Sequence, residues 1–249
     1  MTSDMKDEQV MKDQAMRDVI DESANAASAL AASALVTRAA EFAQATLQGD
    51  SSGHDWWHVW RVWQSALRIG KCEGADLEVV QLAALLHDIA DWKFHDGDET
   101  AGPRVARNWL AENGASAEVC DQVAAIIESL SFKGAGVDTS MATVEGRVVQ
   151  DADRLDAIGA IGVARAFAFG GHRGRFMHDP TVPPTPHDSF AAYKKNSGPT
   201  INHFYEKLLL LKDRMQTTTG RQIADRRHAF LQSFLEQFLA EWDGADHVR

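Results

Sequence analysis

Apolar side chains recur every three or four residues along most of this sequence, which is the period of a helix with one buried face. Residues 55–71 show the pattern with Trp56, Val59, Trp60, Trp63, Leu67 and Ile69. The same spacing and the breaks between segments predict further helices over residues 35–47, 77–89, 104–112, 117–130, 144–157, 199–217 and 222–242. No run of alternating β-branched and aromatic residues stands out as a strand. The pattern therefore predicts an all-α fold.

The remaining segments divide the chain into an extension and one domain. Residues 1–33 are rich in Met, Asp, Ala and Ser and weakly periodic, so we expect an extension that is partly disordered or helical. Residues 34–249 then form a single domain with additional C-terminal helices. Gly and Pro residues among the basic residues and histidines of 170–186 favour a long surface loop. The helix expected over 199–217 carries one apolar stripe, formed by Phe204, Leu208, Leu211 and Met215.

The helix expected over 77–89 ends in an unusual way. Five apolar residues, 82–86, precede His87 and Asp88. A helix that is apolar on most sides is buried, and buried polar groups need partners. The His-Asp pair on its own leaves two interpretations open, a chemical site or a helix-terminal histidine beside a capping or ion-paired aspartate.

Composition narrows the function classes. The chain has 249 residues, of which 45% are hydrophobic and 24% charged, as in an ordinary globular protein with a sizeable core. Its formal net charge of −11 argues against general binding of DNA or RNA, because such binding draws its affinity from basic residues on phosphates. The two cysteines, Cys72 and Cys120, lie on separate expected helices without a CxxC pattern, so we expect reduced thiols.

The sequence also bears on location. Acidic residues near the N-terminus are unlike a secretory signal, and residues 26–36 form an apolar stretch too short for a membrane helix, which needs about 20 residues. We therefore expect a cytoplasmic protein without a membrane partner. Its oligomeric state is left open, with a homodimer among the alternatives.

Three motifs occur in a specific order along the chain. They are HDWWH at residues 54–58, LLHDIADWKF at 85–94 and DADRLDAIGAIG at 151–162. Together they resemble the HD-domain superfamily of metal-dependent phosphohydrolases, and within it a small bacterial subgroup similar to nucleotide pyrophosphohydrolases. The resemblance extends over about residues 35–242 and implies a compact helical HD domain.

The resemblance also implies a ligand set for one divalent cation, namely His58, His87, Asp88 and Asp153. Asp151 and Asp153 cannot both face the ion, because two residues turn a helix by about 200°. The resemblance favours Asp153, which leaves Asp151 as an outer acceptor or a solvated residue. Arg154, directly after Asp153, is a weaker candidate for contact with a phosphate.

Two imidazoles and two carboxylates suit a transition metal such as Mn²⁺, Ni²⁺, Co²⁺, Fe²⁺ or Zn²⁺, with Mg²⁺ as a further alternative. Such an ion activates water for hydrolysis. Asp91 is the first candidate for a general base, because it lies one turn after His87 and occupies the position of an acidic residue in related enzymes. Asp96 is the second candidate.

Phosphate requires cations, and three further residues are candidates to contact a phosphorylated substrate. Arg61 lies one turn from His58, Lys93 lies near Asp91, and His54 lies one turn before His58. Structural ion pairs, or an exposed position for His54, are the alternatives. The resemblance implies a nucleotide substrate, with release of pyrophosphate from a nucleoside triphosphate as the most specific expectation. A phosphomonoesterase, a cyclic-nucleotide phosphodiesterase and a non-catalytic nucleotide sensor are the alternatives.

Overall fold

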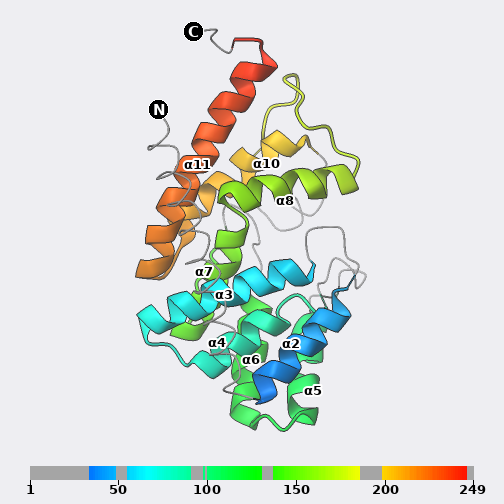
Figure 1. Ribbon diagram of the computed structural model, residues 1–249, viewed down its shortest axis with the longest axis vertical. Coiled ribbons are helices and arrows are strands. Elements are labelled where there is room, and N and C mark those ends of the chain that lie inside the picture. The colour runs from blue at the N-terminus through cyan, green and yellow to red at the C-terminus, as the bar shows by residue number, and fades with distance from the viewer. Residues whose placement is uncertain are drawn as a thin grey trace, which may run out of the picture.

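The computed structural model describes residues 34–48, 55–90, 98, 100–130, 137–185 and 198–245. All regular secondary structure in these residues is helical, so the predicted all-α class is confirmed (Figure 1). The α-helices are α2 (Ala34–Thr46), α3 (Trp56–Glu73), α4 (Leu77–Leu86), α5 (Ala101–Glu112), α6 (Ala117–Ser129), α7 (Val144–Asp156), α8 (Gly159–His172), α10 (Thr200–Glu206) and α11 (Thr218–Trp242). Two 3₁₀ turns, η3 (Leu208–Leu210) and η4 (Lys212–Arg214), precede α11.

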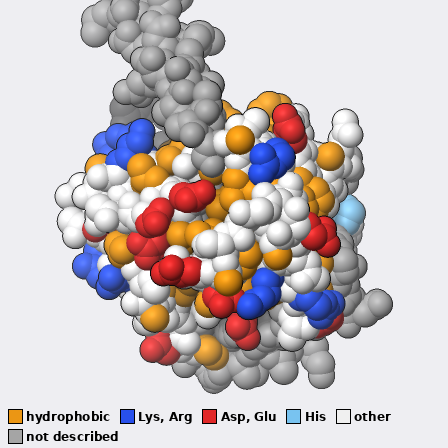
Figure 2. Space-filling model, turned by 90° about the horizontal axis from the view of Figure 1, so that it is seen from below, with side chains coloured by type: hydrophobic (Ala, Val, Ile, Leu, Met, Phe, Trp, Pro, Cys, Tyr) orange, Lys and Arg blue, Asp and Glu red, His pale blue; other side chains and the backbone are white. Residues whose placement is uncertain are grey.

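Helix α7 connects two groups of helices. At one end, α3 packs against α4 and α7, α4 packs against α2 and α6, and α5 pairs with α6. At the other end, α8 packs against α10 and the long α11, whose C-terminal half rises beyond the rest of the body (Figure 1). No helix in the described part of the chain is long and apolar enough to cross a membrane. The surface seen from below has mixed charge, with acidic side chains grouped near its centre and basic ones lying separately (Figure 2).

Capping residues fix where α3 and α4 begin. The Asp55 carboxylate accepts a hydrogen bond from the His58 backbone N–H, and the Asp76 carboxylate accepts from the backbone N–H groups of Glu78 and Val79. Carboxylates at these positions satisfy N–H groups that have no partner within the helix. The cap at Asp55 therefore holds His58 in the first turn of α3.

Helix α4 is buried as its sequence predicts. The apolar residues Leu82 to Leu86 are inaccessible to solvent. The α-helix ends at Leu86, somewhat earlier than expected, and residues 87–90 continue as a turn. This core helix delivers His87 and Asp88 to the interior of the molecule.

The expectation of a single helix over residues 199–217 is wrong. The chain instead forms α10, η3 and η4, with a break at Lys207 (φ −142°) and extended backbone at Met215. The extended backbone directs the N–H groups of Gln216 and Thr217 to the Asp151 carboxylate, which continuous helix would prevent. The apolar stripe is nevertheless buried, because a spacing of three to four residues also suits 3₁₀ turns; its members are Phe204, Leu208, Leu211 and Met215.

A sharp turn joins α7 to α8. Gly159 has φ +76°, a left-handed conformation that other residues adopt at a cost. Three residues later, a Cβ atom at Gly162 would collide with the carbonyl of Ala157. After the turn, α8 packs against α7, α10 and α11. Helix α8 runs to His172, so it includes the first residues of the surface loop expected over 170–186. The expected extension, residues 1–33, lies outside the described residues.

Candidate metal centre

Four side chains from three parts of the chain meet at one point. The Nε2 atom of His58 lies 3.3 Å from Nε2 of His87, 3.3 Å from Oδ2 of Asp88 and 3.5 Å from Oδ1 of Asp153. The Nε2 atom of His87 lies 3.8 Å from the same oxygen of Asp88 and 3.9 Å from that of Asp153. We refer to these four residues as the donor cluster. Both histidines are buried, whereas the Asp153 side chain is 33% exposed, so the cluster opens to solvent on that side.

The far side of each imidazole determines what its Nε2 atom presents. The Nδ1 atom of His87 lies 2.8 Å from the carbonyl oxygen of Ala84, which can only accept, so Nδ1 carries the proton. The Nδ1 atom of His58 lies 2.7 Å from a carboxylate oxygen of Asp156 and donates in the same way. The neutral rings then direct two Nε2 lone pairs at each other and at two carboxylate oxygens. Acceptors that face acceptors repel unless a positive charge lies between them, so this donor set fits a divalent cation.

The charges around His58 agree with that reasoning. Burial lowers the pKa of His58 and Arg165 lowers it further, but Asp156 and Asp88 outweigh both, and the pKa is raised above its usual value of 6.5. The surroundings of this imidazole thus favour positive charge. Burial also opposes ionisation of Asp156, yet hydrogen bonds from His58 and Arg61 hold the pKa of this carboxyl well below its usual range.

The two aspartates of α7 face different ways. Asp153 points to the histidines, whereas Asp151 is fully buried and accepts hydrogen bonds from the N–H groups of Gln216 and Thr217 and from the Thr217 hydroxyl. Burial outweighs these bonds and raises the pKa of Asp151. Asp151 is therefore an internal acceptor that joins α7 to the start of α11, and the alternative of a solvated residue is wrong.

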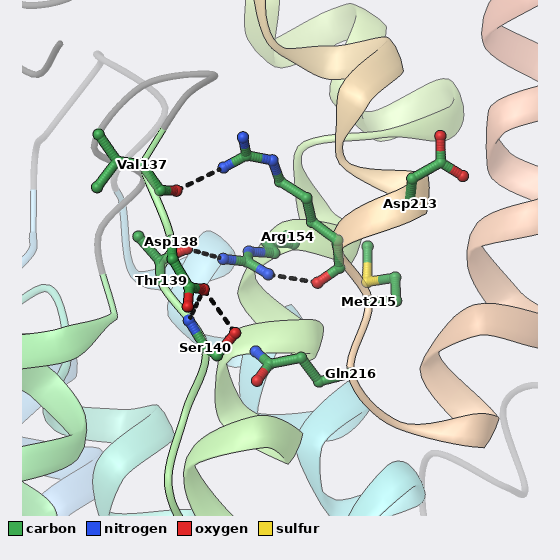
Figure 3. A pocket seen from close by; sticks show the side chains of 9 residues that line it. Val137, Asp138, Thr139, Ser140, Arg154, Asp213, Met215 and Gln216 are labelled. Atoms are coloured by element: carbon green, nitrogen blue, oxygen red, sulfur yellow. Dashed lines mark hydrogen bonds between the residues drawn. The ribbon is translucent and has the colours of Figure 1, made fainter. Parts of the chain in front are cut away.

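Arg61 lies beside the donor cluster, and Arg154 lies elsewhere. The Arg61 guanidinium contacts Asp156 through Nε at 2.7 Å and Nη2 at 3.0 Å. Arg154 is buried and donates to the carbonyl of Arg214 and the hydroxyl of Thr139. It lines a cavity of about 380 Å³ with residues 137–140 and 213–216 (Figure 3). Contact between Arg154 and a phosphate at the donor cluster is therefore not supported.

Four of the residues singled out in the sequence lie outside the described residues. They are His54, Asp91, Lys93 and Asp96. Their expected roles stay predictions.

Sequence reasoning missed two residues that adjoin the donor cluster. Asp156 contacts His58, and Nη1 of Arg165 on α8 lies 3.1 Å from Asp156. Asp156 could have been found, because it follows Asp153 by three residues and therefore shares its helix face. Arg165 could not, because its approach depends on the turn between α7 and α8.

Comparison with known proteins agrees with the geometry. The HD domain family matches residues 56–158, a range that contains all four donors. The YpgQ protein of Bacillus subtilis is 41% identical over 206 residues, which cover 82% of this chain and 92% of the relative.

Solved structures give the same result. A crystal structure from Lactobacillus plantarum has a TM-score of 0.76 and 38% identity and covers 84% of this chain and 97% of its own. An HD-superfamily hydrolase from Bacillus thuringiensis has a TM-score of 0.64 and 41% identity, with coverage of 84% and 96%. YpgQ in complex with ADP has a TM-score of 0.64 and 37% identity, with coverage of 83% and 100%.

The helical fold and the convergence of two histidines and two aspartates define a metal-dependent hydrolase. The chain belongs to the HD-domain superfamily, as a metal-dependent phosphohydrolase.

Proposed function

We propose that the protein hydrolyses a phosphoanhydride bond of a nucleotide, and specifically that it releases pyrophosphate from a nucleoside triphosphate. The donor cluster carries the proposal, because its acceptor atoms fit a divalent cation that would also bind phosphate oxygens. The capture of ADP by YpgQ, a protein 37% identical in the aligned region, supports a nucleotide as the ligand class.

In this proposal His58, His87, Asp88 and Asp153 hold one divalent transition ion, with Mn²⁺ as the first candidate. Such an ion supplies an activated water and neutralises charge on the phosphate. The Nδ1 contacts of the two histidines keep both Nε2 atoms directed inward, so the protein presents its nitrogen donors in place before the ion arrives. The partly exposed side of Asp153 is the side from which substrate reaches the cluster.

Other residues singled out in the sequence supply the remaining roles in the proposal. Asp91 acts as the general base, with Asp96 as the second candidate, and Asp91 directly follows the buried turn residue Ala90. Arg61 and Lys93 contact the phosphates, and His54 contacts the substrate from the N-terminal end of α3.

The proposal is tested by incubating the protein with Mn²⁺ and a panel of nucleoside triphosphates, diphosphates, monophosphates and cyclic nucleotides. Chromatography of the nucleotide products and separate assays of phosphate and pyrophosphate identify the bond that breaks. We expect monophosphate and pyrophosphate from triphosphates in equal amounts. Phosphate from monophosphates, opening of cyclic nucleotides, or binding without turnover would each replace the proposal by the corresponding alternative.

A further inference from the structure

We infer that Asp156 is a positioning residue of the metal centre, which fixes the tautomer and direction of His58 and is itself held by Arg61 and Arg165. This inference rests on the metal site of the proposed function and not on the identity of the substrate.

Three side chains donate to the buried carboxylate of Asp156. Its Oδ2 atom lies 2.7 Å from Nδ1 of His58, 3.0 Å from Nη2 of Arg61 and 3.1 Å from Nη1 of Arg165, and accepts from these nitrogens. Its Oδ1 atom receives Nε of Arg61 at 2.7 Å. The Asp156 side chain is only 4% exposed, so water competes little for these bonds. A carboxylate gripped on both oxygens in this way cannot rotate without breaking several charge-assisted bonds.

Three helices contribute to this arrangement. His58 and Arg61 come from α3, Asp156 is the last residue of α7, and Arg165 comes from α8. The left-handed turn at Gly159 brings α8 back over the end of α7, where the side chain of Arg227 would lie 3.0 Å from a Cβ at that glycine. The position of Asp156 is therefore set by tertiary packing as well as by its hydrogen bonds.

The chemical effect follows from the two nitrogens of imidazole. A neutral imidazole has one N–H and one lone pair, so a carboxylate that accepts the Nδ1 proton leaves the lone pair on Nε2. The Nε2 atom of His58 is the one that faces His87, Asp88 and Asp153. The negative charge of Asp156 also makes this nitrogen a stronger donor to a cation. Arg61 and Arg165 keep the carboxylate ionised and in place.

A purely structural ion pair is the competing interpretation, and Asp151 provides a matched control. Asp151 is a second buried carboxylate on α7, and it also accepts several hydrogen bonds, but they come from Gln216 and Thr217 before α11 and not from a histidine of the donor cluster. Loss of either carboxylate removes buried hydrogen bonds. Only loss of Asp156 releases His58.

The test compares Asp156→Asn and Asp151→Asn with the unchanged protein by titration with Mn²⁺ in a calorimeter, with circular dichroism to confirm the folded state. We expect Asp156→Asn to weaken Mn²⁺ binding by about 10–100-fold, the usual effect of losing a group that orients a ligand. Asp151→Asn should leave the affinity of the folded protein within about twofold, because Asp151 hydrogen-bonds Gln216 and Thr217 and orients no histidine of the cluster. Equal Mn²⁺ affinity in Asp156→Asn and the unchanged protein would overturn the inference.

A second measurement does not depend on the folding of a variant. Nitrogen-15 NMR of histidine-labelled unchanged protein loaded with Zn²⁺ reports which ring nitrogen of His58 binds the metal. We expect coordination by Nε2 and a slowly exchanging proton on Nδ1, and coordination by Nδ1 would refute the inference. If the unchanged protein binds Mn²⁺ but hydrolyses no nucleotide, the proposed function fails while the role of Asp156 stands or falls on these two measurements.

Discussion

The two faces of α7 carry charged side chains that are organised by opposite rules. On one face, Asp153 directs a carboxylate at the two imidazoles, which also lie beside the Asp88 carboxylate, so metal-binding groups gather at one point. On the other, Asp151 faces backbone N–H groups, and the two Nη atoms of Arg154 face a carbonyl and a hydroxyl, so donors face acceptors. Burial of charge therefore does not by itself mark a functional site. Imidazole nitrogens and carboxylate oxygens gathered at one point indicate where a cation binds, and complementary groups indicate a structural joint.

The largest effect is expected when one residue of the donor cluster is removed. We expect Asp88→Ala to lose the bound metal and all measurable hydrolysis while keeping its helical content, because the core of α4 does not depend on this carboxylate. Elemental analysis, a nucleotide assay and circular dichroism measure the three properties. Asp121→Ala serves as a control, since Asp121 is an exposed aspartate of α6 that pairs with Arg107. Full metal occupancy in Asp88→Ala would show that the cluster is not the metal site.

The two aspartates of α7 allow the faces to be tested against each other. We expect Asp153→Asn to weaken Mn²⁺ binding strongly, because a neutral amide replaces an anionic oxygen beside the ion. Asp151→Asn should instead lower the free energy of unfolding by about 1–3 kcal/mol, because an amide cannot accept all the bonds from Gln216 and Thr217. Metal titration and urea denaturation of both variants separate these effects. The reverse outcome would exchange the roles of the two faces.

Arg154 tests the structural face alone. In Arg154→Met the carbonyl of Arg214 and the hydroxyl of Thr139 lose their donor, so we expect the free energy of unfolding to fall by about 1–3 kcal/mol. Mn²⁺ affinity and hydrolysis of the folded variant should be unchanged. A specific loss of hydrolysis at full stability would instead place Arg154 in contact with substrate.

Acidification gives the smallest effect, and it reports on Asp156. Because the folded-state pKa of Asp156 is depressed below 3.8, its ionisation stabilises the fold above that pH, and this contribution is lost as pH falls toward the folded-state pKa. In the metal-free protein, the stability difference between the unchanged chain and Asp156→Asn should shrink by up to about 1.4 kcal/mol per pH unit below 3.8. Urea denaturation of both proteins at several pH values between about 5 and about 3, which span the usual carboxyl range, measures this stability difference. A difference that stays constant over this range would show that Asp156 titrates normally.

The parts of the structure that sequence predicted are those set by local pattern. Helices α3, α4, α6 and α7 follow from periodic apolar residues, and the apolar end of α4 indicated that His87 is buried. Asp153 could be preferred over Asp151 as the candidate metal ligand from two facts alone, namely that residues two apart on a helix point in different directions and that the family resemblance favours Asp153.

The parts that sequence missed depend on partners far away in the chain. The helix expected over 199–217 breaks because the backbone at Gln216 and Thr217 satisfies Asp151, and nothing within that segment indicates the need. Helix spacing places Asp156 on the same face as Asp153, but its partners on α3 and α8 appear only once three helices are assembled. Local propensity carries no information about such contacts.

The turn between α7 and α8 restricts which sequences can support this arrangement. Position 159 requires a residue at ease with φ +76°, and position 162 requires one without a side chain because the Ala157 carbonyl occupies that space. We therefore expect few substitutions to be tolerated at these two positions, although neither has a side chain that could bind metal or substrate, and the steric reason differs between them. In a library of functional variants, we expect both glycines to be retained as often as His58 and His87. Their retention would reflect the backbone geometry of the turn.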